Sequence, residues 1–434
     1  MIETAVSIIV AFAYVKLFLF WLWLWQLKEY HIGRFIAHFQ EGQAFKKIIS
    51  SLWRLKYPKF TSKAIVIALV GVSLGLFMIM QGYYVPAFAL IAVIPLLFQI
   101  PTVLLRKIYI ERARKKREQF PNLLVIGITG SYGKTTTKEF LAHILSKKFN
   151  VLKTKEHQNS EVGVSNCILQ ELKPGHQVFV CEMGAYNRGG IKLLASIARP
   201  RIGVLTGINQ QHMATFGSQE IIVNTKYELI ESLPANGVAF FNIQNKYCVE
   251  LYNKTNIKKV LYGQEARFRG EENILGAMAV AKELGMTDEE ISGAIKGIDA
   301  SLPGAKIQQG KDGFTVIEST YSANPDGVMA ALEYLKKLPG KKVIVMPCLI
   351  ELGQASEEVH KAIGKKIGEV CDLAIITTRD RFKDIKDGAE AGLQNILFLE
   401  NSKDIADMIK RTVSSNDVVL LEGRVPPLLS SYLV

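Results

Sequence analysis

The stretch GITGSYGKTTTKEF, residues 127–140, decides the fold class of this chain. The apolar run LLVIGI (123–128) leads into its glycine-rich turn, and a helix is expected to start near Lys134. A strand, a glycine-rich turn and a helix in this order form a phosphate-binding loop at the edge of a parallel sheet. The sequence therefore predicts an α/β fold with a nucleotide-binding P-loop.

The turn departs from the strict P-loop pattern GxxxxGK[ST] at one position. The first glycine of that pattern would fall at Ile128, and Gly127 and Gly130 flank the turn instead. Small residues still allow backbone N–H groups to face an anion at the start of a helix. The lysine is expected to reach the terminal phosphates, and the threonine hydroxyl to bind Mg²⁺. We therefore predict a nucleotide phosphate site at Gly130, Ser131, Gly133, Lys134 and Thr135.

Two series of short apolar runs alternate with predicted helices after Pro121. The first continues at 178–183, 202–207, 238–242 and 259–263, and the second lies at 314–319, 342–347, 373–378, 396–400 and 417–423. Strands that alternate with helices form a mainly parallel sheet covered on both faces. Thr287, with Glu290 three residues later, predicts a capped helix start. We predict a P-loop ATP-binding domain, 119–302, and a smaller Rossmann-like domain, 303–434, joined near 301–304.

Three apolar runs before residue 118 are long enough to cross a bilayer. They lie at about 6–27, 64–80 and 84–105, and a spanning helix needs about 17–25 residues. The first run lacks a basic start and a small-residue cleavage site, so it is not a cleavable signal peptide. It contains Lys16, whose insertion costs about 3 kcal/mol unless the amine snorkels or finds a partner. We predict a membrane region, 1–118, of three transmembrane helices.

Basic residues are concentrated in this membrane region. Residues 1–118 hold 16 Lys/Arg and 5 Asp/Glu, whereas the rest of the chain holds 37 and 35. A nearly neutral globular part argues against a nucleic-acid partner, and basic flanks suit an anionic membrane lipid surface. Segments 28–63 and 106–117 carry eight and seven Lys/Arg. The positive-inside rule therefore places the N-terminus outside and everything after Arg106 in the cytoplasm. The five scattered cysteines are expected to be reduced thiols.

Residues 127–138 follow the pattern GxTGSxGKTTTK. This pattern resembles the nucleotide loop of the Mur ligases, the ATP-dependent ligases of peptidoglycan precursor synthesis, and folylpolyglutamate synthetase is similar. The likeness runs from about Asn122 to Gly423. It implies ATP as a substrate, Thr136 as a further nucleotide contact and two Mg²⁺ ions as cofactors.

Three further motifs resemble metal-binding segments of that family. CEMGAY (181–186) is similar to EMGA, TGINQQHMATFGS (206–218) to TNIxxxHLxxFGS, and NTKYELIESLP (224–234) to AKxEI. The resemblance implies that Glu182 and His212 bind Mg²⁺ together with Thr135. It also implies that Lys226 reacts with CO₂ to become a carbamylated lysine, whose anionic oxygens suit Mg²⁺. Lys134, His212 and Lys226 are then the expected catalytic residues.

Other segments resemble the nucleotide- and substrate-contacting parts of the family. Asn273 takes the place of an asparagine in the family's adenine-contacting helix, and Asn159 lies in KEHQNSEVGV (155–164), which resembles the family's segment near the acceptor substrate. ESTYSANPDG (318–327) resembles DDxYNANP, which implies Tyr321 and Asn324 as substrate contacts, and IELGQASEEVH (350–360) resembles ELGxxSxxxH. These motifs match the family member that adds D-Ala-D-Ala to a UDP-muramoyl tripeptide better than its siblings.

The likeness fails at several positions. That family member normally opens with a small UDP-binding domain, and apolar runs stand there in this chain. The arginine of the family's PGR motif, which contacts ATP, falls at Ala305, so Lys306 is expected to replace it as a point charge without the guanidinium fork. Further departures are Arg269-Gly270 for His-Asn, Glu318 for Asp, and Glu422-Gly423-Arg424 in place of KGSR.

Together these features predict ATP-dependent amide-bond formation through an acyl phosphate. The expected setting is the cytoplasmic side of a bacterial cell membrane, with D-Ala-D-Ala added to a soluble or lipid-linked muramoyl peptide. Two alternatives stay open: a membrane scaffold that binds ATP without ligating, and a Mur-like ligase of another polymer. The sequence does not indicate the oligomeric state.

Overall fold

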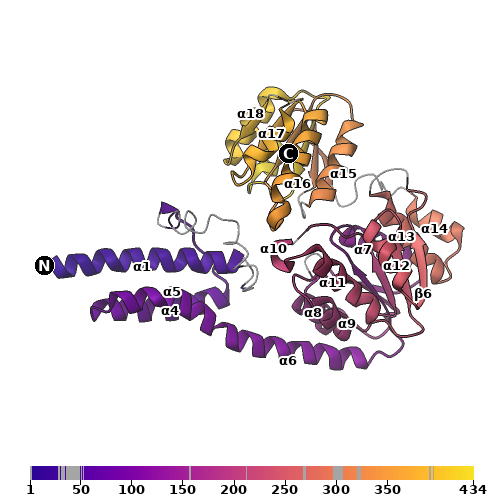
Figure 1. Cartoon of the computed structure of the whole chain (residues 1–434), viewed down its shortest axis with the longest axis horizontal. Coiled ribbons are helices and arrows are strands. Elements are labelled where there is room, and N and C mark those ends of the chain that lie inside the picture. Colours follow the sequence, from indigo (N-terminus) through magenta and orange to yellow (C-terminus); the bar gives the residue numbers. More distant parts are fainter. Residues whose placement is uncertain are drawn as a thin grey trace. The chain divides into compact units, whose positions relative to one another are not determined.

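The computed structural model describes residues 2–27, 30, 35, 49, 51, 53–155, 158–211, 213–266, 270–296, 306–319, 324–390, 392–393 and 395–434. The chain forms two compact units, Met1–Glu111 and Arg112–Val434, and Figure 1 traces their elements. The predicted join near 301–304 lies outside the described residues.

The first unit is helical. Its elements are α1 (Ile2–Leu27), α4 (Ser62–Met80), α5 (Tyr84–Leu97) and the first part of α6 (Gln99–Glu118). Within the described part of the chain, three helical segments are long and apolar enough to cross a membrane, at Val6–Leu27, Ser62–Met80 and Tyr84–Glu118. The third therefore runs from the last apolar run directly into the basic segment.

Glycines on α4 allow α1 to approach closely. A Cβ at Gly71 would lie 2.0 Å from the ring of Phe18, and one at Gly75 would lie 2.1 Å from the ring of Tyr14. The Tyr14 hydroxyl donates to the Gly71 carbonyl at 2.7 Å. This small-xxx-small spacing is typical of helix pairs in membranes. Lys16 has the partner that its place in an apolar helix requires, because its Nζ donates to the Ser51 carbonyl at 2.6 Å.

The second unit begins with the end of α6 and contains two sheets. The first sheet is wholly parallel, in the order β2-β3-β1-β4-β5-β6. Its strands are β1 (Leu124–Thr129), β2 (Val151–Lys153), β3 (Val178–Glu182), β4 (Ile202–Leu205), β5 (Val238–Asn242) and β6 (Lys258–Tyr262). Its helices are α7 (Lys134–Leu145), α8 (Glu161–Glu171), α9 (Gly190–Ala198), α10 (Met213–Phe216), α11 (Gln219–Glu231), α12 (Lys246–Lys254), α13 (Glu271–Glu283) and α14 (Asp288–Ile295).

Both faces of this sheet are buried, as its unbroken apolar strands predict. Ile126 and Ile128 of β1 pack in one core with residues of α7 and α13. Gly127 lies between them in the strand and faces Leu229 of α11 on the opposite side. The predicted capping box at Thr287 is confirmed, since both of its reciprocal bonds are present.

The second sheet has the order β11-β10-β9-β12-β8-β7, and only β7 is antiparallel. Its strands are β7 (Lys306–Gln309), β8 (Thr315–Ser319), β9 (Lys342–Met346), β10 (Leu373–Ile376), β11 (Ile396–Phe398) and β12 (Val418–Glu422). Helices α15 (Pro325–Lys336), α16 (Ser356–Val370) and α17 (Phe382–Ala389) share one core, and α18 (Ser402–Thr412) and α19 (Leu429–Leu433) share another. A short 3₁₀ helix, η1 (Gly353–Ala355), precedes α16.

The predicted fold class is confirmed: a parallel P-loop sheet is followed by a second doubly wound sheet, also of six strands. Every apolar run identified as a strand forms one. Two strands were not predicted, β2 and β7, because β2 has only three residues and β7 is a polar edge strand of sequence KIQQ. All five cysteines are free and buried, which agrees with the expectation of reduced thiols.

Candidate nucleotide and metal site

The glycine-rich turn connects β1 to α7 at the carboxyl edge of the first sheet. Gly133 has φ +79°, and a Cβ there would lie 2.3 Å from Oδ1 of Asn273. A Cβ at Gly130 would lie 2.2 Å from the hydroxyl of Thr206. No side chain caps the start of α7. The first N–H groups of this helix are therefore available to an anion, as a phosphate site requires.

Lys134 folds back over this turn. Its Nζ donates to the carbonyl of Gly130 at 2.8 Å and to that of Ser131 at 3.1 Å. Burial lowers the pKa of Lys134, and the nearby carboxylate of Glu182 partly opposes that shift. The Lys134 side chain is therefore held over the opening of the loop, where it would contact a terminal phosphate of a nucleotide.

Glu182 ends β3 and connects several predicted site residues. The Thr135 hydroxyl donates to its Oε2 at 2.9 Å, and the Asn159 side-chain amide donates to its Oε1 at 3.0 Å. The Glu182 backbone N–H donates to the hydroxyl of Thr154 at 3.0 Å. The carboxylate is 2 % exposed. Parallel strands bring β1 and β3 together at one edge, so the loop threonine, this glutamate and Asn159 converge although they are far apart in the sequence.

Lys138 is a member of this cluster that the sequence did not single out. Its Nζ lies 3.4 Å from Oε2 of Glu182 and 3.2 Å from Oε1 of Glu139. The side chain is fully buried, and its amine has no hydrogen-bond partner among the described residues. The available signal was its position four residues after Lys134 on α7, which places both lysines on one helix face.

Lys226 is buried on α11 with an unusual environment for an amine. It is 3 % exposed, and its Nζ lies 5.7 Å from the centre of the Phe216 ring. Burial, and secondarily the charge of Lys134, lower the pKa of Lys226 to about 7, against a smaller opposing effect of Glu228. The Glu228 carboxylate instead accepts from the backbone N–H groups of Gly189 and Lys192 at the start of α9, at 2.7 and 2.9 Å. Burial thus favours the neutral form of the Lys226 amine.

Asn273 lies beneath the loop at the start of α13. Its Oδ1 accepts from the Thr137 hydroxyl at 3.2 Å, and its Nδ2 donates to the Gly270 carbonyl at 3.0 Å. The asparagine that resemblance assigned to nucleotide contact therefore also supports the loop itself. Thr136 lies in the first turn of α7 and is partly buried.

The other predicted residues either lie outside the described part of the chain or make no hydrogen bond to this cluster there. His212, Ala305, Arg269 and Tyr321 lie outside the described residues. Lys306 begins the exposed strand β7, opposite Glu318. The Asn324 side chain caps α15 by accepting from the Gly327 N–H at 3.1 Å. In the described part of the chain, neither Lys306 nor Asn324 is hydrogen-bonded to the phosphate loop.

Two further motif residues have structural surroundings in the second sheet. His360 is fully buried, and its Nε2 accepts from the Leu349 N–H at 2.9 Å, which holds the segment after β9. Glu422 ends β12 and is 1 % exposed, and burial raises its pKa to about 8 against a hydrogen bond with Ser319. Its Oε2 has no partner among the described residues. A buried carboxyl with a raised pKa therefore stands in the segment that departs from the family's KGSR motif.

The described residues fit one Mg²⁺ ion at Thr135 and Glu182. Mg²⁺ usually takes one or two protein oxygens and keeps waters and substrate phosphates as its other ligands. A hydroxyl and a carboxylate that already touch, beside a phosphate loop, match that donor set. No group of three His, Cys, Asp or Glu side chains gathers for a metal within the described ranges.

The parallel sheet, the phosphate loop and the lysine–glutamate cluster define a P-loop nucleotide-dependent α/β enzyme. Comparisons with known proteins identify the family within this class. The Mur ligase middle domain matches residues 128–305, and the Mur ligase glutamate ligase domain matches residues 306–425.

Relatives and solved structures agree with these family matches. The UDP-N-acetylmuramoyl-tripeptide--D-alanyl-D-alanine ligase of Synechocystis is 29% identical over 337 residues, which cover 71% of this chain and 73% of that protein. The Bacillus subtilis ligase of the same name is 27% identical, covering 69% and 72%. A crystal structure of MurF from Acinetobacter baumannii has a TM-score of 0.67 at 25% identity, covering 75% and 79%. MurF from Thermotoga maritima in complex with ADP has a TM-score of 0.62 at 27% identity, covering 74% and 80%.

The chain belongs to the Mur ligase family. It is an ATP-dependent ligase that forms amide bonds.

Proposed function

We propose that this ligase adds D-alanyl-D-alanine to the peptide of a muramoyl precursor at the cytoplasmic face of a bacterial membrane. The observation that carries the proposal is the cluster of Lys134, Thr135, Asn159 and Glu182 at the carboxyl edge of the first sheet. This cluster occurs in a chain that aligns with 73% of a ligase named for that reaction.

The reaction has two steps. The acceptor carboxylate attacks the γ-phosphorus of ATP, so a C–O–P bond forms and ADP leaves. The amine of D-Ala-D-Ala then attacks the acyl carbon, the C–O bond breaks, inorganic phosphate leaves and the nitrogen loses a proton. Positioning and charge stabilisation dominate phosphoryl transfer. Lys134 and the free N–H groups of α7 would supply both, since they face the terminal phosphates from one side.

Mg²⁺, when bound, supplies charge neutralisation on the phosphate oxygens. Thr135 and Glu182 would hold the first ion, and a carbamate on Lys226 would hold the second together with His212. Carbamate formation needs a neutral amine: Nζ attacks CO₂, a C–N bond forms and the amine loses a proton. Burial of Lys226, with its lowered pKa of about 7, supports this step at neutral pH.

Lys138 would act as a positioning residue for this chemistry. Its buried amine lies between Glu182 and Glu139 and would hold the Glu182 carboxylate in the orientation that an Mg²⁺ ligand needs.

The acceptor would be presented at the membrane. Three apolar helices precede the ligase domains in this chain, and the family matches begin only at residue 128. A lipid-linked muramoyl peptide would lie at the same surface as the anchored enzyme. The rival within the same activity is a soluble UDP-linked tripeptide, with the helices serving only to localise the ligase.

The test uses the full chain in lipid nanodiscs. Phosphate release from ATP and Mg²⁺ is measured with UDP-muramoyl tripeptide or its lipid-linked counterpart, each with and without D-Ala-D-Ala. We expect release that needs both substrates, is greater with the lipid-linked acceptor, and is lost in Glu182→Gln and Lys226→Ala. Equal or greater turnover with the soluble acceptor would reject the lipid-linked acceptor while keeping the ligase.

A second candidate is a scaffold that binds ATP without ligating. It is favoured by Glu422, a buried carboxyl whose pKa is raised to about 8, in the segment that departs from the family's KGSR motif. Nucleotide binding that is lost in Lys134→Ala, together with no phosphate release on any pairing of acceptor and amine, would support this scaffold over a ligase.

A further inference from the structure

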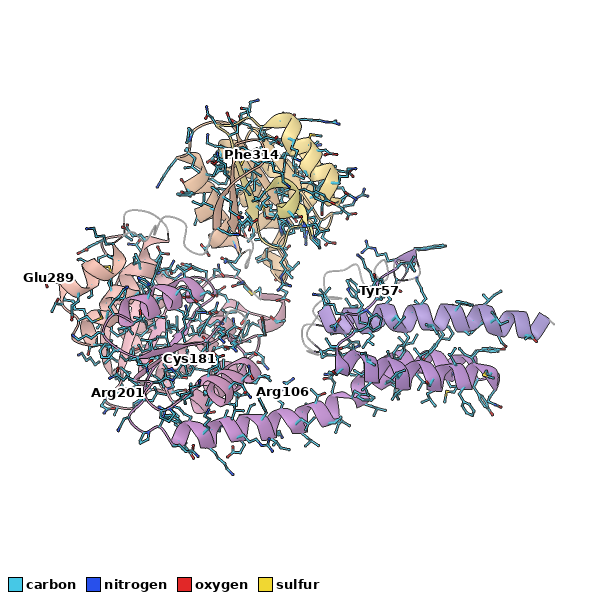
Figure 2. The ribbon with its side chains drawn as sticks, turned by 180° about the vertical axis from the view of Figure 1, so that it is seen from behind. Tyr57, Arg106, Cys181, Arg201, Glu289 and Phe314 are labelled. Carbon is cyan, nitrogen blue, oxygen red and sulfur yellow. The ribbon has the colours of Figure 1, made fainter. Side chains whose placement is uncertain are left out.

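A pocket of about 890 Å³ lies at the amino-terminal edge of the first sheet, at the other end of the strands from the phosphate loop. Its walls come from the end of α6, the start of β1, the segments that precede β4 and β5, and α9 from Lys192 onward. Figure 2 labels Arg201, one of its wall residues, at the edge of this domain and Cys181 in the interior. The pocket is therefore separate from the nucleotide site.

The walls carry an excess of positive charge. Four of the lining residues are cationic, and none is Asp or Glu: the cations are Arg117, Lys192, Arg199 and Arg201. Arg199 pairs with Glu118, which lies just outside the pocket. Lys192 and Arg201 are exposed and have no ion pair within the described ranges. A cleft lined by one sign of charge concentrates ligands of the opposite sign, so the pocket favours an anion.

Arg117 builds the pocket and does not need to bind the anion itself. It is 6 % exposed, and its guanidinium donates to the carbonyls of Ala198, Phe120 and Leu123 at 2.9, 2.7 and 3.0 Å. These bonds hold the end of α6 against the sheet. Burial, and then the charge of Arg199, lower the pKa of Arg117. An anion in the pocket would relieve that repulsion and would be contacted by the more exposed cations.

The position of the pocket on α6 indicates the source of the anion. Arg117 lies twelve residues after Leu105, the last residue of the apolar run, on the same helix. A rise of 1.5 Å per residue separates the two by about 18 Å along that helix. Anionic lipids attract basic residues by about 1 kcal/mol each only within a Debye length of the surface, so this general attraction acts on the basic residues nearer the apolar run, and a lipid in the pocket has to be held by direct contacts. The remaining walls include Pro121, Leu124 and Leu233, which suit the glycerol and upper acyl carbons of a lipid.

We propose that this pocket binds the phosphate head group of an anionic phospholipid, through Lys192, Arg199 and Arg201. The inference rests on the proposed membrane location of the chain and is independent of its ligase substrates. A bound head group would attach the chain to the bilayer in addition to the apolar helices. This attachment would leave the phosphate loop, at the other end of the strands, accessible.

The test measures lipid retention by the full chain in neutral detergent, using native mass spectrometry. Phosphatidylglycerol is titrated against phosphatidylcholine, without ATP or ligase substrates. The pocket variant is Lys192→Glu with Arg201→Glu. The matched control is Lys147→Glu with Lys173→Glu, which makes the same charge change at exposed positions of the same domain. Lys192→Ala with Arg201→Ala provides a milder pocket variant should the charge reversal reduce folding.

We expect retention of phosphatidylglycerol at least tenfold stronger than that of phosphatidylcholine. The pocket variants should lose at least that factor, and the control should stay within twofold of the unmodified chain. Equal retention by the pocket variant and the control would overturn the proposal. Displacement of phosphatidylglycerol by millimolar inorganic phosphate would also overturn it, in favour of a soluble phosphate ligand. Flotation of the chain with vesicles separately reports whether the apolar helices insert, and the nanodisc assay reports the ligase.

Discussion

At the scale of single residues, the protonation state of Lys226 makes the proposed reaction sensitive to pH. Its pKa is lowered to about 7, so the neutral amine that can take up CO₂ increases as pH rises through 7. We expect ligase activity to rise several-fold between pH 6 and 7.5, and added bicarbonate to raise the rate most at the lower pH. Lys226→Ala should lose about 10²-fold or more, as when one charge-stabilising group is removed from a site.

Lys226→Arg separates a carbamate from a simple cation. Arginine keeps the positive charge but is never neutral at these pH values. Initial rates with and without bicarbonate are the measurement. An arginine variant as active as the unmodified chain, or a rate that bicarbonate leaves unchanged at pH 6, would contradict the carbamate.

The raised pKa of Glu422 leads to a prediction about how the stability of the fold depends on pH. Its pKa in the folded chain is raised to about 8 from an ordinary 4.5. Between these values the folded state binds more protons than the unfolded state, so the stabilisation present below pH 4.5 is lost as pH rises through 8. Glu422→Gln avoids burying the charge. It should raise the melting temperature on the order of 5 °C at pH 8.5 and leave it nearly unchanged at pH 4.5.

The measurement for Glu422 is thermal unfolding of the full chain in detergent at both pH values. Glu390→Gln, at an exposed carboxylate of the same domain, is the control and should have no pH-dependent effect. The same shift in both variants would show that Glu422 is not the source.

At the scale of elements, the contact between α1 and α4 depends on two glycines. Gly71→Leu should push α1 away, because Phe18 already fills the space that any side chain would occupy. Overpacking of this kind costs about 1–3 kcal/mol. Ser73→Leu, on an exposed part of the same helix, should have little effect. Thermal unfolding followed by tryptophan fluorescence reports this contact directly, since three of the four tryptophans lie in α1. Equal melting curves for both variants would exclude a packing role for Gly71.

At the scale of the whole molecule, the uneven charge predicts how the chain crosses the membrane. Gln81→Cys, in the uncharged connection between α4 and α5, should react with an impermeant maleimide in intact cells. Ser146→Cys, at the exposed end of α7, should react only after the cells are opened. The native cysteines are all buried and give little background. The reverse labelling pattern would invert the proposed orientation.

Most of the fold followed from local patterns in the sequence. The apolar runs, the glycine-rich turn and the capping box at Thr287 each depend on residues within a short window, so they could be recognised before the fold was known. β7 was missed because a polar edge strand has no apolar signature: its pairing with β8 decides it.

The sequence by itself determined the class of protein, since β1, the turn and α7 with Lys134 and Thr135 are consecutive in the chain. Only the tertiary structure decided that Thr135, Asn159 and Lys138 become partners of Glu182. It also decided that the pKa of Lys226 is lowered and where the basic pocket lies. These properties arise from parallel pairing and burial, which bring together residues that are tens of positions apart and exclude water from them. Neither the pairing of the strands nor the burial of these side chains can be read from the order of the residues alone.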